Sequence, residues 1–257
     1  MAINTAAFSP KQFQVLIAEQ DVFGTIEATN DYHALDVGKT DTGQVGTLLS
    51  VVVKSPLSNS DLSFKDCVVT SLTLNGDVGT EGGRIKFSAT FQTGSVVEDL
   101  SDASTTVDTA FAASENYFMS GWSDVAYRKI YGVDDLVLSA FSLTLENPAT
   151  FSGLVSTGYE IVSRAGEFSA NLDITAKYDA NTEPLMASFN NQTQHAATAA
   201  QETKLNHQDA LANGSFGISM PKTFLTNVAF NEGDVMMLDV SVKAVGDGSN
   251  ALVEVSC

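Results

Sequence analysis

The histidines are the first residues of this chain to consider for chemistry, and their spacing fits no catalytic or metal-binding motif. His33 lies in a polar stretch near Asp31 and Asp36, so a metal site is conceivable there, but a solvated loop histidine is the simpler interpretation. His195 and His207 are twelve positions apart, which differs from the i, i+4 spacing of a zinc-binding pair on a helix. We therefore predict no metal-binding residues.

Cys67 and Cys257 are the only cysteines. A chain of 257 residues with two cysteines is not a disulfide scaffold, so we expect a buried thiol at Cys67, where a strand starts, and a loose thiol at Cys257. Neither cysteine has a histidine close in sequence to activate it, and no G-x-S-x-G nucleophile elbow occurs. The sequence therefore offers no nucleophile of a familiar type.

Carboxylates are abundant, and some occur in pairs that a glycosidase or a calcium site could use. The pairs are Glu98 with Asp99, Asp134 with Asp135, and Asp77 near Glu81. None of them fits the D-x-[DN]-x-[DN]-G calcium loop, so exposed, solvated carboxylates are the default interpretation. We predict no catalytic and no cofactor-binding residues, and hence no enzyme.

Two glycine-rich stretches superficially resemble phosphate-binding loops. They read GKTDTGQVGT and NGDVGTEGGR, and neither matches G-x-x-x-x-G-K-[ST]. The second lies between two strand-like segments, so turn formation explains its glycines better than phosphate binding does.

The charge of the chain is unusual. It has 31 acidic and 13 basic residues, for a formal net charge of −18. An exposed basic surface for nucleic acid is therefore not expected, because phosphate contacts need clustered lysine and arginine. The acidity fits solubility, a salty environment, or repulsion of a polyanion. We find no secretory signal and no apolar run of the ~20 residues that span a bilayer, and we expect a soluble protein.

The clearest structural pattern is an antiparallel hairpin over residues 64–94. Alternation with a period of two places every second side chain on one face of a strand. Two such segments flank the glycine-rich stretch, which predicts a hairpin with one buried face. The expected core residues are Val69, Leu72 and Leu74 on the first arm and Ile85, Phe87, Ala89 and Phe91 on the second.

The rest of the chain consists mostly of short strand-like segments separated by Gly, Asn and Asp turns. Capping residues and apolar spacing predict a helix over residues 102–118, and good helix formers suggest another over residues 195–211. Trp122, Tyr127 and Tyr131 are expected to anchor a connecting segment in the core. This pattern predicts an all-β sandwich or barrel with one or two helices. The further expected strands are 12–18, 48–53, 136–145, 159–178, 185–189, 216–220, 226–230 and 235–245.

The segment SLTL occurs twice, at residues 71–74 and 142–145, with Asn75 and Asn147 following. After each copy come a polar turn and a strand containing FSA. The two copies suggest an internal duplication, with halves of about 12–100 and 135–246, although chance is the alternative in a chain rich in Ser, Thr and Leu.

Four segments resemble, in order, the tail tube (major tail) proteins of tailed bacteriophages. Residues 164–175, RAGEFSANLDIT, fit the pattern R-x-G-x-F-x-A-x-L-x-I-T, and SLTL followed by Asn resembles the strand before it. The opening QVLIAEQDVFGT and the closing FGISMPKTFLTNVAFNEGDVMMLDVSVKAV also resemble the family. The resemblance covers about residues 12–246, and residues 102–134 depart from it.

This resemblance implies an antiparallel β-sandwich of the phage tail tube type, with an N-terminal arm at 1–11, a tube domain at 12–246 and a C-terminal tail at 247–257. It implies a virion protein, assembled in the host cytoplasm, that polymerises into stacked rings and forms the conduit for genome delivery. A hexameric ring is favoured, and a duplicated domain would give a trimer with pseudo-six-fold symmetry. The implied partners are further copies and the tape measure, initiator and terminator proteins, with double-stranded DNA passing through without specific binding. A head decoration protein, a tail adaptor or a carbohydrate-binding sandwich is the alternative.

Two further expectations concern the assembled tube. We expect the loop at 27–47 to bridge neighbouring subunits or rings. We also expect an acidic lumen, lined by the polar faces of the 64–94 hairpin and of residues 159–178, with Lys86, Arg164 or Lys177 paired to carboxylates. The alternative places the acidity on the outer surface of the tube.

Overall fold

The computed structural model contains one helix and many strands within the residues that it describes. It describes residues 2–4, 37–38, 49–53, 61–80, 83, 85–96, 98–100, 125–155, 158–190, 202–207, 217–231, 235–245 and 252–256. The elements are β1 (Ala2–Asn4), β2 (Val37–Gly38), β3 (Leu49–Val53), β4 (Asp61–Asp77), β5 (Lys86–Gln92), β6 (Glu98–Leu100), β7 (Tyr127–Ile130), β8 (Val133–Asp134), β9 (Leu138–Glu146), β10 (Ala149–Val155), β11 (Gly158–Arg164), β12 (Ser169–Lys177), α2 (Glu183–Asn190), β13 (Thr203–Asn206), β14 (Gly217–Met220), β15 (Thr223–Asn231), β16 (Met237–Ala244) and β17 (Glu254–Ser256).

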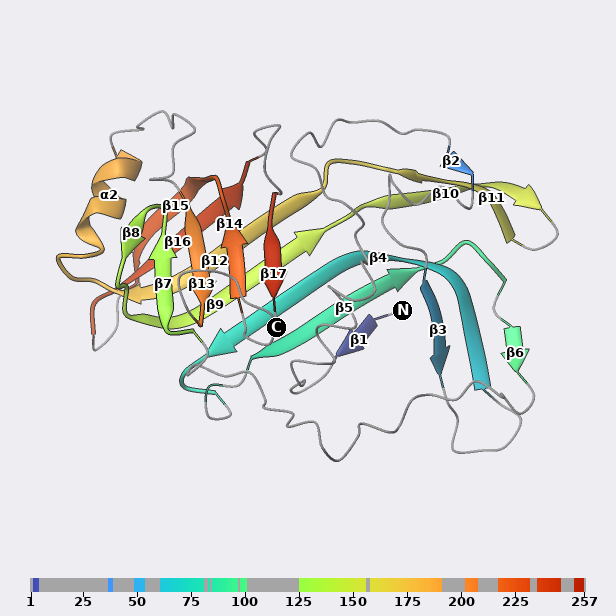
Figure 1. Cartoon of the computed structure of the whole chain (residues 1–257), viewed down its shortest axis with the longest axis horizontal. Helices are drawn as coiled ribbons and strands as arrows, with labels where there is room; N and C mark the ends of the chain where they lie inside the picture. Colours follow the sequence, from blue (N-terminus) through green and yellow to red (C-terminus); the bar gives the residue numbers. More distant parts are fainter. Residues whose placement is uncertain are drawn as a thin grey trace.

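Nine strands form the main sheet. Its order is β1-β5-β4-β9-β12-β16-β15, and β3 and β6 also pair with β4. Its long strands run side by side along the molecule (Figure 1) and pair antiparallel throughout. The expected all-β, antiparallel fold is therefore confirmed.

The predicted hairpin is present as β4 and β5, which pair antiparallel from Val68 opposite Gln92 to Asn75 opposite Lys86. All the core residues expected on its two arms are buried wherever the structure describes their side chains. The glycine-rich stretch is a turn, as expected. The Asp77 carboxylate accepts hydrogen bonds from the Gly79 backbone N–H at 2.7 Å and from the Thr80 hydroxyl at 2.9 Å.

The two SLTL segments lie side by side, because β4 pairs directly with β9. Leu72 lies opposite Leu145, Thr73 opposite Thr144, and Leu74 opposite Leu143. The leucines face the core with at most 1% of their surface exposed, and the threonines lie on the other face of the sheet. The two SLTL segments are therefore hydrogen-bonded neighbours in one sheet.

Asn147 follows the second copy and is buried with 1% exposure. Its side-chain amide donates to the Val69 carbonyl at 3.2 Å, and its backbone N–H donates to the Thr70 carbonyl at 2.9 Å. Both acceptors lie where the pairing of β4 with β5 shifts register between Val69 and Ser71. Asn147 therefore links the end of β9 to the bulge of β4, whereas Asn75 is exposed.

Residues 159–178, which we expected to be one strand, form two strands in different sheets. β11 pairs with β10 and β2 in a three-stranded sheet, and β12 lies in the main sheet. The break is a corner, at which the Ala165 N–H donates to the Pro148 carbonyl at 2.9 Å and Phe168 turns into the core. The β10–β11 hairpin extends beyond the main sheet (Figure 1, right), and our sequence analysis missed β10.

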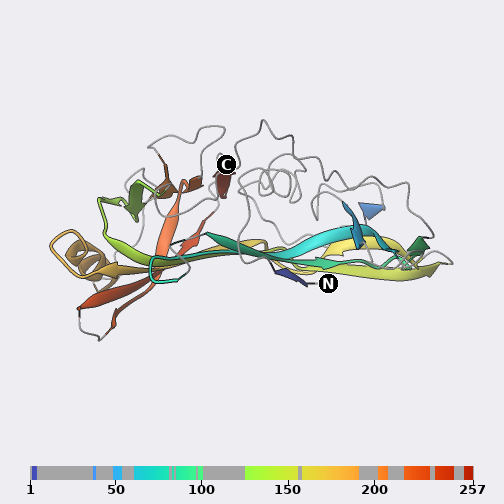
Figure 2. The ribbon, with the colours of Figure 1, turned by 90° about the horizontal axis from the view of Figure 1, so that it is seen from below.

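A second sheet covers part of the main sheet (Figure 2). It has five strands in the order β17-β14-β13-β7-β8. Leucines of β4, β9 and β12 in the main sheet share one apolar core with Ile130, Leu205, Ile218 and Met220 of the second sheet. The molecule is therefore a sandwich, and β17 makes residues 254–256 of the expected tail part of it.

Two further secondary-structure predictions are wrong. Residues 203–206, expected in a helix, form β13, because this segment gains ladder hydrogen bonds from β7 and β14 and buries Leu205. Residues 185–189, expected to be a short strand, lie in helix α2. Thr182 and Pro184 at its start and the four-residue spacing from Leu185 to Phe189 are the signals that we missed.

Several other predictions lie outside the described residues. These are the strand at 12–18, the helix at 102–118, the position of Trp122, and most of the loop at 27–47. Within that loop the structure describes only β2, in which Val37 lies opposite Val162 and Gly38 opposite Ile161 of β11.

Candidate assembly surfaces

The face of the main sheet that points away from the core is polar and broad. Its central row reads Ser88, Thr73, Thr144, Asn171 and Lys243 across five neighbouring strands. Because side chains alternate across a strand, the leucines of the same strands point to the core while this face presents hydroxyls and amides. In Figure 2 the second sheet lies on the opposite side of the main sheet from this face.

The charges on this polar face nearly balance. Four carboxylates and three ammonium groups are spread over β4, β5, β9, β12 and β16, and Lys243 approaches Glu167 at 3.9 Å. The acidic excess of the chain is therefore not concentrated on this face. The charged residues on it are Asp77, Glu146, Asp173, Asp239, Lys86, Lys177 and Lys243.

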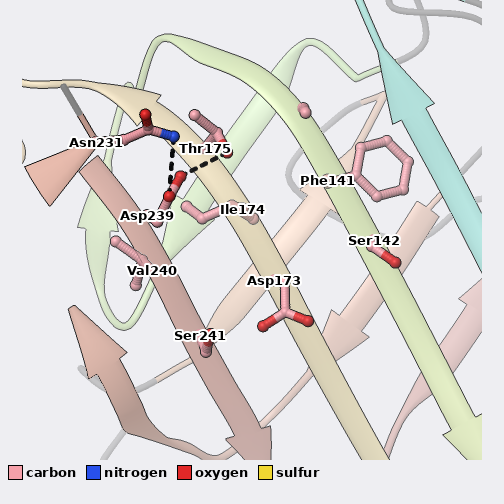
Figure 3. Close-up of a pocket in the computed structure, with 10 residues that line it drawn as sticks. Phe141, Ser142, Asp173, Ile174, Thr175, Asn231, Asp239, Val240 and Ser241 are labelled. Atoms are coloured by element: carbon pink, nitrogen blue, oxygen red, sulfur yellow. Dashed lines mark hydrogen bonds between the residues drawn. The ribbon is translucent and has the colours of Figure 1, made fainter. Parts of the chain in front are cut away.

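A shallow hollow of about 380 Å³ lies on the same face, between β9, β12 and β16 (Figure 3). The Asp239 carboxylate accepts from the Thr175 hydroxyl at 2.8 Å and from the Asn231 side-chain amide at 2.9 Å. Asp173 lies opposite Ser142 on one side and Ser241 on the other. Both oxygens of Asp239 are thus engaged, so it braces neighbouring strands rather than offering a free base.

The sheet ends in two edges that could join other chains. β15 has a described neighbour, β16, on one side only. At the other edge, β1 covers β5 at Ser88, Ala89 and Thr90. A long edge strand presents backbone N–H and C=O groups that readily pair with another strand.

The structure describes two of the histidines and cysteines that we considered for chemistry, His207 and Cys67. His207 is exposed just after β13, and Cys67 is buried, with its Sγ 3.4 Å from the Phe64 carbonyl oxygen. His33, His195 and Cys257 lie outside the described residues. Across the described ranges, no three His, Cys, Asp or Glu side chains gather as a metal-binding group.

Of the paired carboxylates, the structure describes both side chains only for Asp134 and Asp135. Asp134 contacts Lys129, with 3.4 Å between ammonium and carboxylate, and Asp135 has a positive φ of 59° in the turn that follows. Lys129 also approaches Glu202 at 3.9 Å. Burial lowers the pKa of Lys129, but the hydrogen bond to Tyr127 and the charge of Asp134 outweigh it, so the net direction is upward.

A small second core fastens the β10–β11 hairpin to β4. Val68, Tyr159 and Val162 are buried together, and the rings of Phe151 and Tyr159 meet edge to face with centroids 4.8 Å apart. Burial raises the pKa of the Tyr159 phenol to about 12, and the Asp66 carboxylate adds to the shift. Sequence patterns do not reveal this contact, because it joins residues that are distant in sequence.

The fold, the long antiparallel sheet and its open edges fit a protein that builds larger assemblies. The model of the phage tail tube protein family matches residues 20–244. This chain belongs to the phage tail tube family. A comparison with curated proteins gave no match.

Membership confirms the resemblance that the SLTL and 164–175 segments suggested. Phage tail tube proteins are structural, so the chain is a structural component of the virion tail that assembles into a tube with other tail proteins. Within the described residues, no helix has the length and apolar character needed to cross a membrane.

Proposed function

We propose that this tail tube protein polymerises into stacked rings whose channel conducts the phage genome into the host. The observation that carries this proposal is the open main sheet, with unlike strands at its two edges. Joining β15 of one chain to the opposite edge of the next, where β1 covers three residues of β5, continues the main sheet around a ring. Closure removes every exposed edge, which is how barrels avoid uncontrolled association.

The polar face is the candidate lining of the channel. It offers hydroxyls, amides and nearly balanced charges, with no cluster of lysine or arginine among the described residues of this face. Since DNA-binding surfaces need such clusters, DNA would pass without tight binding. This arrangement does not favour the acidic lumen that we expected, and it leaves the outer surface as the place for the acidic excess. Lys177 is exposed on this face, and the side chain of Arg164 lies outside the described residues.

One tube domain per chain is the arrangement that we propose, and with it a hexameric ring. The two SLTL strands pair within a single sheet instead of belonging to two separate sandwiches. A trimer with pseudo-six-fold symmetry would need two complete tube domains. We propose assembly in the host cytoplasm with the tape measure, initiator and terminator proteins, and a role without enzymatic activity.

The proposal is tested by assembling the purified chain and imaging it by negative-stain microscopy. We expect rings and tubes from the natural chain. Ala229 is exposed on the edge strand β15, so Ala229→Glu should give a folded monomer. Ala126→Glu adds the same charge at an exposed residue just before β7 and is the matched control. A natural chain that stays monomeric at every concentration, or an Ala229→Glu variant that forms normal rings, contradicts the proposal.

A further inference from the structure

The first strand of the chain, β1, occupies part of the sheet edge to which a neighbouring copy would have to pair. β1 pairs antiparallel with Ser88, Ala89 and Thr90 of β5 and lies along that strand in Figure 1. β5 spans seven residues, Lys86–Gln92. β1 therefore covers the middle of the edge, which is the part that another strand needs for a continuous ladder.

The two edges of the main sheet carry little of the protection that edge strands usually have. Charged side chains and prolines normally keep such strands from pairing with other chains. β15 reads TFLTNVAFN, with no charge and no proline, and β5 reads KFSATFQ, with the single charge of Lys86. After a register shift near Thr226, β15 pairs regularly with β16 from Asn227 to Asn231. In a chain with a formal net charge of −18, these two strands are suited to pairing with each other between copies.

Strand direction decides which partner continues the sheet. Neighbouring strands alternate in direction from β1 to β15, so β15 runs opposite to β5 and in the same direction as β1. Copies related by rotation about an axis along the strands keep these directions. β15 of one copy therefore pairs antiparallel with β5 of the next when β1 has left, but would run parallel to β1 if β1 stayed. Antiparallel pairing is the more stable kind.

Length also makes β1 the weaker competitor for the β5 edge. β1 has three residues, whereas β15 has nine. A short strand near a chain terminus opens locally at a small cost in free energy compared with global unfolding. A second copy can therefore replace a short ladder with a longer one. A head-to-tail contact needs both edges at once, so covering one edge is enough to slow association of free chains.

We propose that β1 is an autoinhibitory strand, which covers the β5 edge in the free chain and leaves when β15 of the next copy pairs there. This inference rests on the proposed ring assembly and adds the step that controls it. The energy that assembly gains from the new β15–β5 ladder is reduced by the loss of the β1–β5 ladder.

The first test removes the ladder of β1 without changing the length of the chain. Proline has no backbone N–H, so the triple variant Ala2→Pro, Ile3→Pro and Asn4→Pro cannot pair with β5. The matched control places threonine at the same three positions and keeps every N–H. We expect the proline variant to form rings at about tenfold lower concentration than the natural chain, and the threonine variant to match the natural chain. Light scattering and negative-stain microscopy measure this, and circular dichroism checks the fold.

A second arm asks whether β15 is the strand that takes the freed edge. Adding Ala229→Glu to the proline variant should abolish its gain, because the new carboxylate lies on β15. Ala126→Glu in the same background should leave the gain unchanged. A gain that persists with Ala229→Glu contradicts β15 as the occupant.

The third arm locks β1 in place. Asn4 lies directly opposite Ser88, so Asn4→Cys with Ser88→Cys places two cysteines at a separation that a disulfide spans. We expect the oxidised variant to stay monomeric and to form rings after a reductant is added. Ser88→Cys alone, under the same oxidising conditions, should assemble like the natural chain. Mass spectrometry identifies the bond.

Rings that form from the oxidised variant, or a disulfide that does not form, overturn the inference while leaving ring assembly intact. Equal assembly of the proline and threonine variants also overturns the inference alone. If neither the natural chain nor the proline variant assembles at any concentration, the proposed function fails together with this inference.

Discussion

Thr73 lies directly opposite Thr144 in the pairing of β4 with β9. Leu72 with Leu145 and Leu74 with Leu143 flank this pair on both sides, so the two SLTL segments are related by a local two-fold axis through the threonines. The same two-fold axis also relates the outer strands β5 and β12, but it does not pair the residues that an alignment of the two FSA segments would pair. Opposite the threonines lie Ser88 on β5 and Asn171 on β12, whereas aligning the two FSA segments would equate Ser88 with Ser169. The offset of two residues preserves the faces of both strands.

The pairing predicts that substitutions at adjacent residues of β9 change the free energy of unfolding by very different amounts. Leu143→Ala should reduce the free energy of unfolding by about 2–5 kcal/mol, because it leaves a cavity between the two sheets. Thr144→Ala, on the polar face, should change it by less than about 1 kcal/mol. Denaturant unfolding measures both values. Equal losses from the two variants would contradict the assigned register.

Asn75 and Asn147 each follow an SLTL segment, but replacing them should reduce the stability of the fold by different amounts. Asn147→Ala removes the hydrogen bond to the Val69 carbonyl at a buried site and should cost about 1–3 kcal/mol. Asn75 is exposed, so Asn75→Ala should cost about 0.5 kcal/mol or less. Thermal or denaturant unfolding of the two variants makes the comparison. A small effect of Asn147→Ala would show that the bulge of β4 does not depend on this amide.

Tyr159 should give the chain a distinct alkaline titration. Its folded pKa of about 12 exceeds the ordinary value of 10.0, so the neutral phenol is favoured by folding. The associated stability is complete below about pH 10 and is lost as the pH rises through about 12. Absorbance titration of the 6 tyrosines should show one late step that Tyr159→Phe removes. An unchanged titration of that variant contradicts the assignment.

Salt should promote assembly of the natural chain. Its net charge of −18 makes copies repel one another, and screening at 0.15 M ionic strength shortens that repulsion to about 8 Å. The concentration at which rings appear should therefore fall as sodium chloride is added, as measured by light scattering and negative-stain microscopy. Assembly that weakens with salt would instead show that ion pairs dominate the contacts between chains.

The sequence by itself determined the strands whose side chains alternate most cleanly. The period of two in β4, β5, β9 and β16 requires one buried and one polar face, and the turn at Asp77 follows from its glycines. The family also followed from the sequence, because the order of SLTL, the 164–175 segment and the closing strands is a linear property of the chain.

Only the tertiary structure decided which strands pair and which distant side chains are in contact. The pairing of the two SLTL strands, the corner at Phe168 and the contact of Asn147 with Val69 join residues that no local pattern connects. Residues 203–206 became a strand because two neighbours supplied ladder hydrogen bonds, which outweigh a weak helical preference.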